Sequence, residues 1–457
     1  MRNSAVVAML LGLVALWGAS PPSRAQTAPA ARVQLGQSVF PLNGPWRFHT
    51  GDDLRWARPD FDDSGWEQVD LTPEAGAHDG DVGLPGYVPG WSQRGHARYS
   101  GYAWYRLRTS IDAAGAPLAL AGPTLVDSTY QVYVDGRLMG GPGVFSGGTP
   151  VVYSVRPTLY SVPGPANATH LIAFRVWMDA GDLGTESGGI HVAPTIGRAD
   201  DMQQLYQVQW LRTFNGYVVD AVEPMAFVIL ALMACALIAS RTGSDYHWLA
   251  VALVLLALLR LNQVLYAWTS WQSLRSYDIA TAVVLRPLVL AAWTLAWRDW
   301  FGLEKRSRWT WMVGALAIAY VGVALAGRPW FLPGAERLHA VANVGVVGLR
   351  LAFAVLYLGV VMAGAARLRG PLAALGGLAA LLVGVGLFAT ELNQLGIPGI
   401  WFPYGVGVSR GQFAYAAFVV VMFGLLLVRQ ASEITAARQP AHTLVPAGSP
   451  GPASTRG

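Results

Sequence analysis

The sequence has very little cysteine. Cys235 is the single cysteine among 457 residues, and it lies within a long apolar run. A chain with one thiol cannot form an internal disulfide framework or a metal site made of several cysteines. We therefore expect neither feature, and we expect no metal centre in this protein.

Charge is also scarce. Charged residues make up 13% of the chain, while hydrophobic residues reach 53%. The charged share is about half that of a typical globular protein, as expected where much of a chain lies away from water. The formal net charge of +5 is unevenly placed, so it gives no reason to expect a nucleic-acid partner. No cofactor motif accompanies this composition, and we expect no cofactor.

Seven apolar blocks separate the charged segments in the second half of the chain. A helix that crosses a bilayer needs about 20 mostly apolar residues, because hydrocarbon cannot satisfy exposed backbone polar groups. The sequence therefore predicts a seven-helix transmembrane domain over 217–429, with the lipid bilayer as its partner. The predicted spans are Tyr217–Ser240, Trp248–Trp268, Ile279–Trp297, Trp309–Ala326, Ala340–Ala363, Leu372–Thr390 and Gln412–Val428.

The N-terminus has the pattern of a secretory signal peptide over 1–25. Arg2 precedes a short apolar run, Ala5–Trp17, and the small residues Ser23 and Ala25 stand ahead of Gln26. Cleavage after Ala25 would leave residues 26–199 outside the cytoplasm, and the first span would then run inward. An uncleaved anchor is the alternative.

Loop charges favour the same orientation. Cytoplasmic loops of membrane proteins carry an excess of Lys and Arg. We predict a bacterial inner-membrane protein with an extracytoplasmic N-terminal domain and a cytoplasmic tail over 430–457. The loops predicted to be inside hold Arg241, Arg298, Lys305, Arg306, Arg308, Arg367 and Arg369, and those predicted to be outside hold Arg275, Arg328, Arg337 and Arg410.

Between Val33 and Ala199 the periodicity changes from helical to alternating. Short segments rich in Val, Tyr, Trp and Thr are separated by Gly and Pro, and the Asp135-Gly136 step predicts a tight hairpin. We predict an all-β sandwich over 26–199, joined to the first span by a juxtamembrane helix over 200–216. The predicted strands are Pro45–Thr50, Ala103–Ile111, Tyr130–Val134, Val151–Val155 and His170–Met178.

Four motifs in this region are specific. Leu42–Phe48 (LNGPWRF), Asp60–Trp66 (DFDDSGW), Gly101–Arg106 (GYAWYR) and Tyr130–Gly136 (YQVYVDG) occur in that order. The set resembles the sugar-binding jelly-roll domain of glycoside hydrolase family 2, which implies a galactose-binding-like jelly roll. In those hydrolases the catalytic carboxylates lie on a separate barrel domain, and here membrane helices follow instead. We expect no enzyme and no catalytic residue, since no paired acids for glycoside hydrolysis are evident.

A Gly-rich, irregular stretch over His78–Tyr99 contains the candidate ligand residues of the sandwich. Loops at the end of a sandwich are common recognition sites, and aromatic rings with an arginine suit a carbohydrate. The alternative is a packed loop that binds no ligand. The candidate residues are Tyr87, Trp91, Arg94, His96 and Tyr99.

Other residues of the motifs have a structural interpretation. We expect Trp46, Trp66 and Trp104 to lie in the sandwich core, because large rings dominate such cores. The acidic turn Asp60, Asp62 and Asp63 has the oxygen ligands that Ca²⁺ prefers, but Asp-rich turns more often bond their own backbone.

Six ionisable residues interrupt the apolar blocks. Charges inside spans are rare, and they either pair with one another or mark function. Asp220 and Glu223, three residues apart, share one helix face. The cluster is either a static network of ion pairs or a functional site. As a functional site, it would be a switchable polar group or a pocket for an anion. Its members are Asp220, Glu223, Arg260, Arg286, Arg350 and Glu391.

The whole architecture looks like the bacterial seven-transmembrane receptors with diverse intracellular signalling modules. That resemblance implies a sensor of an extracytoplasmic ligand, often proposed to be a carbohydrate, which drives a cytoplasmic output domain. Only 28 residues follow Arg429, and Pro440–Gly457 is rich in Pro, Ala, Gly and Ser. We therefore expect the signalling partner to be a separate cytoplasmic protein, or the output module to be lost.

Two other functions stay open at this point. A transporter or membrane enzyme would use the arginine and acid cluster. A membrane-anchored carbohydrate-binding module would need only one span, and seven are predicted.

Overall fold

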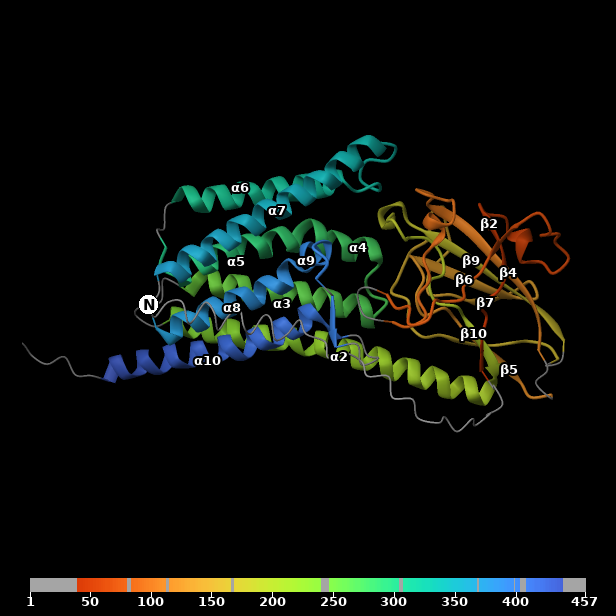
Figure 1. The fold of residues 1–457 in the computed structure, drawn as a ribbon, viewed down its shortest axis with the longest axis horizontal. Helices are drawn as coiled ribbons and strands as arrows, with labels where there is room; N and C mark the ends of the chain where they lie inside the picture. Colours follow the sequence, from red (N-terminus) through yellow and green to blue (C-terminus); the bar gives the residue numbers. More distant parts are fainter. Residues whose placement is uncertain are drawn as a thin grey trace, which may run out of the picture. The chain divides into compact units, whose positions relative to one another are not determined.

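The structure is a computed structural model that describes residues 39–79, 84–111, 115–165, 168–239, 246–303, 307–367, 370–397, 399–402 and 408–438. The predicted signal peptide and residues 439–457 of the predicted tail lie outside this range. The described residues belong to one compact unit, Val39–Gly457. They form a β region up to Arg198 and a helical region from Ala199 onward (Figure 1).

The β region consists of two antiparallel sheets. The larger sheet has the strand order β3-β2-β4-β9-β6-β7, and the smaller has β1-β10-β5-β8. The long strands β4 and β9 pair over ten residues at the centre of the larger sheet. The bounds are β1 Val39–Pro41, β2 Trp46–Thr50, β3 Glu67–Val69, β4 Gly101–Ser110, β5 Leu118–Ala121, β6 Thr129–Val134, β7 Arg137–Gly140, β8 Leu159–Ser161, β9 Thr169–Met178 and β10 Thr195–Arg198.

One hydrophobic core lies between the two sheets. Trp46, Phe48 and Phe174 enter it from the larger sheet, and Leu120 and Ile196 enter it from the smaller one. In β2 the buried residues alternate with more exposed ones, because successive side chains of a strand point to opposite faces. The core therefore explains why the alternating segments of the sequence fold into two packed layers.

The hairpin predicted at Asp135-Gly136 is present. β6 pairs with β7 through Val134 and Arg137, and both turn residues have positive φ, 50° at Asp135 and 84° at Gly136. Two consecutive left-handed residues match the right-handed twist of the flanking strands. The prediction of a strand over Val151–Val155 is wrong.

In place of that strand, the structure has a single bridge between Val144 and Val151. Pro150 and Pro157 flank the segment and lack the N–H that a sheet ladder requires.

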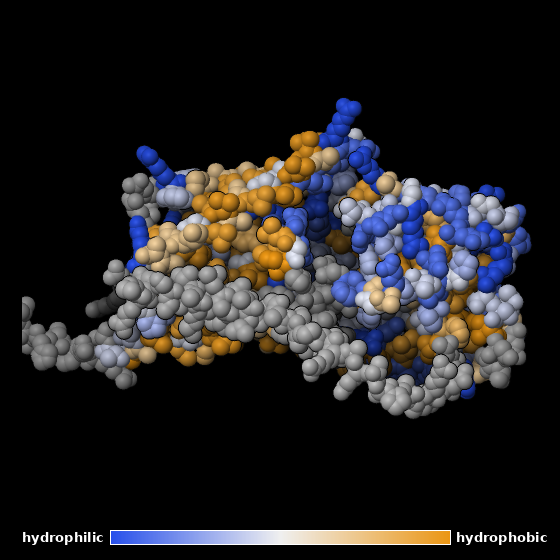
Figure 2. All heavy atoms as spheres, viewed as in Figure 1, coloured by the Kyte–Doolittle hydropathy of each residue, from blue (hydrophilic) through white to orange (hydrophobic). Residues whose placement is uncertain are grey.

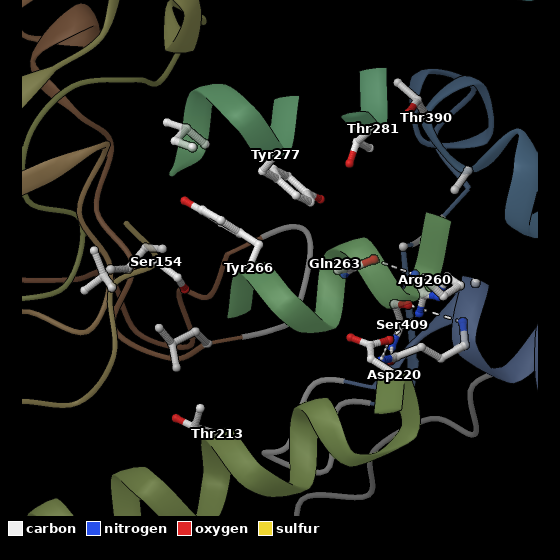
Figure 3. Close-up of a pocket in the computed structure, with 18 of the residues that line it drawn as sticks. Ser154, Thr213, Asp220, Arg260, Gln263, Tyr266, Tyr277, Thr281, Thr390 and Ser409 are labelled. Carbon is white, nitrogen blue, oxygen red and sulfur yellow. Dashed lines mark hydrogen bonds and ion pairs between the residues drawn. The ribbon is translucent and has the colours of Figure 1, made fainter. Parts of the chain in front are cut away.

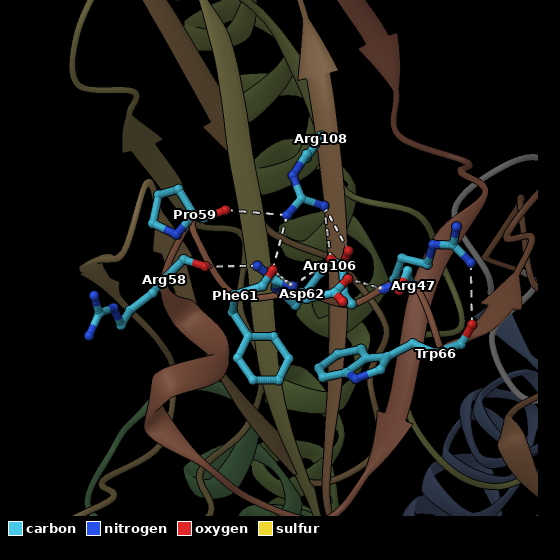
Figure 4. A network of polar contacts seen from close by, with 10 residues as sticks. Arg47, Arg58, Pro59, Phe61, Asp62, Trp66, Arg106 and Arg108 are labelled. Atoms are coloured by element: carbon cyan, nitrogen blue, oxygen red, sulfur yellow. Dashed lines mark hydrogen bonds and ion pairs between the residues drawn. The ribbon is translucent and has the colours of Figure 1, made fainter.

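A network of arginines covers part of the larger sheet (Figure 4). The Arg106 side chain is fully buried, and its Nη1 donates to the Asp63 carboxylate at 2.5 Å and to the Phe61 carbonyl at 3.3 Å. Arg108 donates to the same carboxylate at 2.8 Å. Asp63 is therefore the counter-ion that makes a buried arginine tolerable in this sheet.

The three acids considered as Ca²⁺ ligands, Asp60, Asp62 and Asp63, have separate partners. Asp60 pairs with Arg58 at 2.8 Å, and Asp62 accepts from the backbone N–H of Ser64 at 3.0 Å. Asp63 is engaged by arginines, as described above. Among the described residues, no group of three acidic, histidine or cysteine side chains is placed to hold a metal ion.

Among its described residues, the helical region has six helices that are long and apolar enough to cross a membrane. The predicted block Leu372–Thr390 differs, because its helix α8 has 17 residues and ends at Leu387. The bounds are α2 Ala199–Ile238, α3 His247–Trp268, α4 Leu274–Asp278, η5 Ile279–Leu285, α5 Arg286–Trp300, α6 Ser307–Ala326, α7 Glu336–Arg367, α8 Pro371–Leu387, α9 Ala389–Gln394 and α10 Arg410–Arg438. α4, η5 and α5 form one continuous span, Leu274–Trp300.

These helices pack around α5 and expose apolar side chains. α5 contacts α3, α6 and α7, while α10 contacts α2 and α8. Leu232, Val344 and Val420 are 64%, 73% and 73% exposed. Figure 2 shows hydrophobic side chains over much of the visible helical surface and hydrophilic ones over the β region. An apolar surface of this extent is expected of helices that face lipid.

The Arg106–Asp63 pair yields a stability prediction. Asp63→Ala removes the counter-ion of a buried guanidinium, which costs about 3–5 kcal/mol and lowers the melting temperature of the full-length protein by roughly 10 °C. Asp60→Ala, three residues away, removes only an exposed pair and leaves the melting temperature unchanged. Thermal unfolding of the detergent-solubilised protein, followed by near-ultraviolet circular dichroism, compares the two. Equal melting temperatures would contradict the assigned role of Asp63.

Candidate functional site

The structure places Trp91 of the candidate ligand loop in the core of the β region. Its side chain is 1% exposed, packs against Phe48, and donates from Nε1 to the Tyr99 carbonyl at 3.1 Å. A methyl group on Gly188 would come within 2.2 Å of the indole. The hydroxyl of half-buried Tyr99 donates to the Tyr102 carbonyl at 2.5 Å. The buried Trp91 ring therefore offers no free face to a ligand.

Arg94 and His96 stabilise the same loop. The Arg94 guanidinium donates to the carbonyls of Pro89 at 3.2 Å and Asp70 at 2.8 Å. The His96 ring lies 3.0 Å from the Glu67 carboxylate. Both side chains are half-buried, so their polar groups fix the backbone of the loop.

Tyr87 stacks on a buried histidine. Its ring is parallel to that of His191, with centroids 5.1 Å apart, and its hydroxyl donates to Glu186 at 3.2 Å. The ring nitrogens of His191 lie 2.9 Å from the Val88 carbonyl and 3.1 Å from the Asp127 carboxylate. Burial lowers the pKa of His191, but the hydrogen bond and charge of Asp127 outweigh it, so the pKa is raised overall.

A second group of candidates meets inside the helical region (Figure 3). Arg260 of α3 forms ion pairs with both Asp220 and Glu223 of α2, with Nε 2.6 Å from Glu223. Its Nη1 donates to Gln263 at 2.7 Å, and Gln412 of α10 donates to Asp220 at 2.8 Å. The two carboxylates are 3% and 4% exposed. The sequence spacing predicted that Asp220 and Glu223 share one face of a helix, and in the structure this face contacts Arg260.

Arg350 and Glu391 form a separate pair. Arg350 of α7 is 5% exposed and donates through Nε and Nη2 to the two oxygens of the Glu391 carboxylate of α9. This bidentate geometry satisfies both groups at once. The break between α8 and α9 carries Glu391 to the arginine.

Arg410 was not among the predicted site residues. It begins α10, is 2% exposed, and donates to the Ile397 carbonyl at 2.7 Å, the Ala389 carbonyl at 2.8 Å and the Asn393 amide oxygen at 2.7 Å. These bonds tie the start of α10 to α9 and to the segment that follows α9. The only sequence signal was its position immediately before the last apolar block.

Arg286 has a different environment from the other three arginines. It is half-buried and begins α5, immediately after the π-helical turn η5. Its backbone N–H bonds to the Thr281 carbonyl five residues earlier. Pro287 explains this turn, because its ring would crowd the carbonyl of Val283 in a regular α-helix. π-Turns are frequent at functional sites.

These residues line one cavity of about 880 Å³. Loops of the β region, including Ser154, also contribute to its wall. The cavity thus joins the predicted polar cluster, Glu223 and Glu391 excepted, to the β region. Its polar side chains in the helical region include Asp220, Arg260, Gln263, Tyr277, Thr281, Arg286, Arg350, Thr390, Asn393, Ser409, Arg410, Gln412 and Tyr415.

The Arg260 cluster generates a prediction with an internal rescue. Arg260→Met leaves two buried carboxylates without a cation, which costs about 3–5 kcal/mol. The triple variant Arg260→Met, Asp220→Asn, Glu223→Gln removes all three charges together and recovers most of the melting temperature. Thermal unfolding of the detergent-solubilised full chain, with size-exclusion chromatography, checks both. A triple variant no more stable than the single one would contradict the assignment.

The His191–Asp127 contact predicts a pH dependence. Because its folded pKa is raised above the unfolded value, the contribution of His191 to stability is fully present below about pH 6.5. That contribution is lost as pH rises through the folded pKa. The melting temperature of the wild type should therefore exceed that of His191→Gln more at pH 5.5 than at pH 8.5. Asp127→Asn should show the same narrowing gap, and a gap independent of pH would refute the prediction.

Comparisons with known proteins give a partial match. No protein-family profile matches the chain, and no curated protein matches it. A calcium-binding mutant of Bacteroides uniformis beta-glucuronidase 2 is 18% identical with a TM-score of 0.24, covering 35% of this chain and 17% of that one. A beta-glucuronidase from glycoside hydrolase family 2 is 14% identical with a TM-score of 0.26, covering 36% and 18%.

A third structure gives a similar partial match. Bifidobacterium dentium beta-glucuronidase complexed with coumarin-3-O-glucuronide is 15% identical with a TM-score of 0.23, covering 36% of this chain and 31% of that one. The chain thus spans less than a third of the length of these enzymes. Their activity and ligands do not transfer to it, although one of them belongs to the family that the sequence motifs resemble.

Proposed function

We propose that this protein is a transmembrane sensor. In this proposal the β region binds an extracytoplasmic ligand, and the helices pass a conformational change to a separate cytoplasmic protein. The support comes from one feature of the fold, the helix α2, which contacts the β region as well as other helices.

α2 runs without interruption for 40 residues, from Ala199 to Ile238. It begins directly after strand β10, and its Met202 is fully buried against Ala119 and Ala121 of the smaller sheet. Further along, the same helix carries Asp220 and Glu223 to Arg260. A displacement of the sheet therefore has a stiff route to the polar cluster of the helical region. This continuity is the observation that carries the proposal.

A second contact connects the two regions. Arg156 of the β region donates to the Trp268 carbonyl at 3.1 Å and to the Ser270 hydroxyl at 2.5 Å, at the end of α3. The backbone N–H of Leu274, which begins α4, donates to the Val152 carbonyl at 2.8 Å. The irregular segment around Val152 is thus bonded to the loop between the second and third spans.

α2 has a weak point at the polar cluster. Pro224 lies inside the helix, and a proline lacks the N–H that would bond the carbonyl four residues earlier, which here belongs to Asp220. The helix can bend at such a position at low cost. The Arg260 cluster therefore lies where a change in the angle of α2 has the largest effect on its contacts.

The ligand and partner classes follow from the sequence motifs and the predicted topology. The resemblance to a sugar-binding jelly roll supports a carbohydrate ligand. The predicted orientation, with the β region outside the inner membrane and the C-terminus inside, supports a cytoplasmic signalling partner. Anchoring alone does not account for six long apolar helices, because one is enough.

The connector role of α2 is tested with full-length protein in lipid nanodiscs. The single cysteine Cys235 is exposed on α2 and takes an environment-sensitive bimane label. Gln204, also exposed, lies between the buried anchor Met202 and the polar cluster. We expect a glycan panel to contain a ligand that changes bimane emission in the wild type. Gln204→Pro, which breaks the helix at a cost of about 3 kcal/mol or more, abolishes that change while glycan affinity stays within about twofold.

Gln204→Ala is the matched control and keeps the emission change. A full response in Gln204→Pro would show that α2 is not the connector. A panel without any binding glycan would reject carbohydrate as the ligand class.

A further inference from the structure

Arg286 lacks the counter-ion that the neighbouring arginines have. Arg260 and Arg350 each form ion pairs, and Arg410 is bonded to backbone carbonyls and an amide. Within the described parts of the chain, Arg286 makes neither a hydrogen bond from its guanidinium nor an ion pair, although it lines the same cavity.

The acids close to Arg286 are already engaged. The charge of Arg286 acts electrostatically on two acids, Glu391 and Asp278. Both oxygens of Glu391 accept from Arg350, and Asp278 pairs with Arg328 at 3.0 Å. Together with the Asp220 and Glu223 pairs to Arg260, these contacts give each of the four described carboxylates another arginine as its partner.

The charges around the cavity therefore do not balance. Five arginines line it; four of them, at positions 260, 286, 350 and 410, lie at the polar cluster, whereas Arg212 is exposed. Among the described residues, three carboxylates pair with these four arginines, two on α2 and one on α9, while the Asp127 carboxylate of the same lining pairs with His191. This leaves one positive charge at the cluster. An arginine without a counter-ion inside an apolar helix lowers the stability of the folded protein. An anion that binds beside Arg286 neutralises it and thereby stabilises the folded protein.

The local geometry suits a ligand larger than a single atom. The volume of about 880 Å³ falls within the usual range for small-molecule sites, about 300–1,000 Å³. The π-turn η5 holds Arg286 next to Thr281, and Tyr277 lies one helical turn before Thr281 on the same wall. A guanidinium presents a planar fork that matches an oxyanion through two parallel hydrogen bonds.

We propose that the cavity of the helical region binds an oxyanion, a carboxylate or a phosphate, and that Arg286 neutralises it. This proposal rests on Arg286 and not on the predicted ligand loop of the β region, and it holds whether or not the protein is a sensor. A soluble anion and the phosphate of an anionic lipid share this chemistry, so the test separates them.

The experiment measures thermal unfolding of the full-length protein in phosphatidylcholine nanodiscs. Sodium phosphate or sodium acetate replaces sodium chloride at constant ionic strength. A bound anion stabilises the folded state in a saturable way. We expect at least one of the two salts to raise the melting temperature of the wild type, and Arg286→Gln to weaken its apparent affinity at least tenfold. Arg337→Gln, which removes an exposed arginine of α7, should titrate like the wild type.

A second arm uses nanodiscs that contain phosphatidylglycerol. If a lipid headgroup fills the site, the wild type is already stabilised there, added salts give no further rise, and Arg286→Gln loses the stabilisation. Should Arg286→Gln fail to fold, Arg286→Lys keeps the charge without the planar fork and should bind several-fold more weakly. The proposal is overturned if neither salt nor anionic lipid stabilises the wild type, or if the Arg286 variant that folds responds as the wild type does.

Discussion

Charge in an apolar environment has to be neutralised, and the helical region is arranged around that requirement. Arg260 lies between Asp220 and Glu223, so α3 is fastened to α2 at a point where neither helix can present these groups to hydrocarbon. Gln412 adds α10 to the same cluster. α10, which lies far from α2 and α3 in the sequence, thus joins them at this cluster. Removing a buried charge from such a cluster is costly because the remaining charges stay behind.

The same constraint explains the irregular backbone near the cavity. α8 ends at Leu387 and α9 follows after Phe388, so carbonyls lose their helical donors at this point. Arg410 donates to the carbonyls of Ala389, at the start of α9, and of Ile397, after α9, and Glu391 on α9 neutralises Arg350. Non-helical backbone at membrane depth is tolerated where it lines a cavity or is buried in protein. The break and the cavity are therefore parts of one arrangement.

The β region and the helical region depend on each other through α2. One end of this helix is buried against a sheet, and its middle carries Asp220 and Glu223 to the polar cluster. A helix that crossed a membrane only as an anchor would need no such packing at its outer end. The proposed sensor function is based on this continuity. Loops of the β region also line the cavity, so a ligand-dependent change in the β region would alter the cavity.

The prediction of individual elements succeeded where a residue pattern has one physical meaning. Alternation over Pro45–Thr50 and the Asp135-Gly136 step led to the observed strand and turn, because both depend on local backbone geometry. Val151–Val155 has the composition of a strand, yet it makes one bridge only. Its prolines were visible in the sequence, but the partner strand it lacks was not. Trp91 illustrates the same limit, since nothing in its spacing separates a ligand platform from a core ring.

The sequence by itself determined that long apolar helices follow a strand-rich region, and that six charges interrupt those helices. Both conclusions need only composition and periodicity, because burial of the backbone in hydrocarbon leaves few alternatives. Only the tertiary structure decided which charges meet. Arg260 takes two acids, Arg350 takes one, and Arg286 takes none of the described residues, because pairing depends on how each helix is rotated and where it breaks. Spacing along one helix carries no information about the face that a distant helix presents to it.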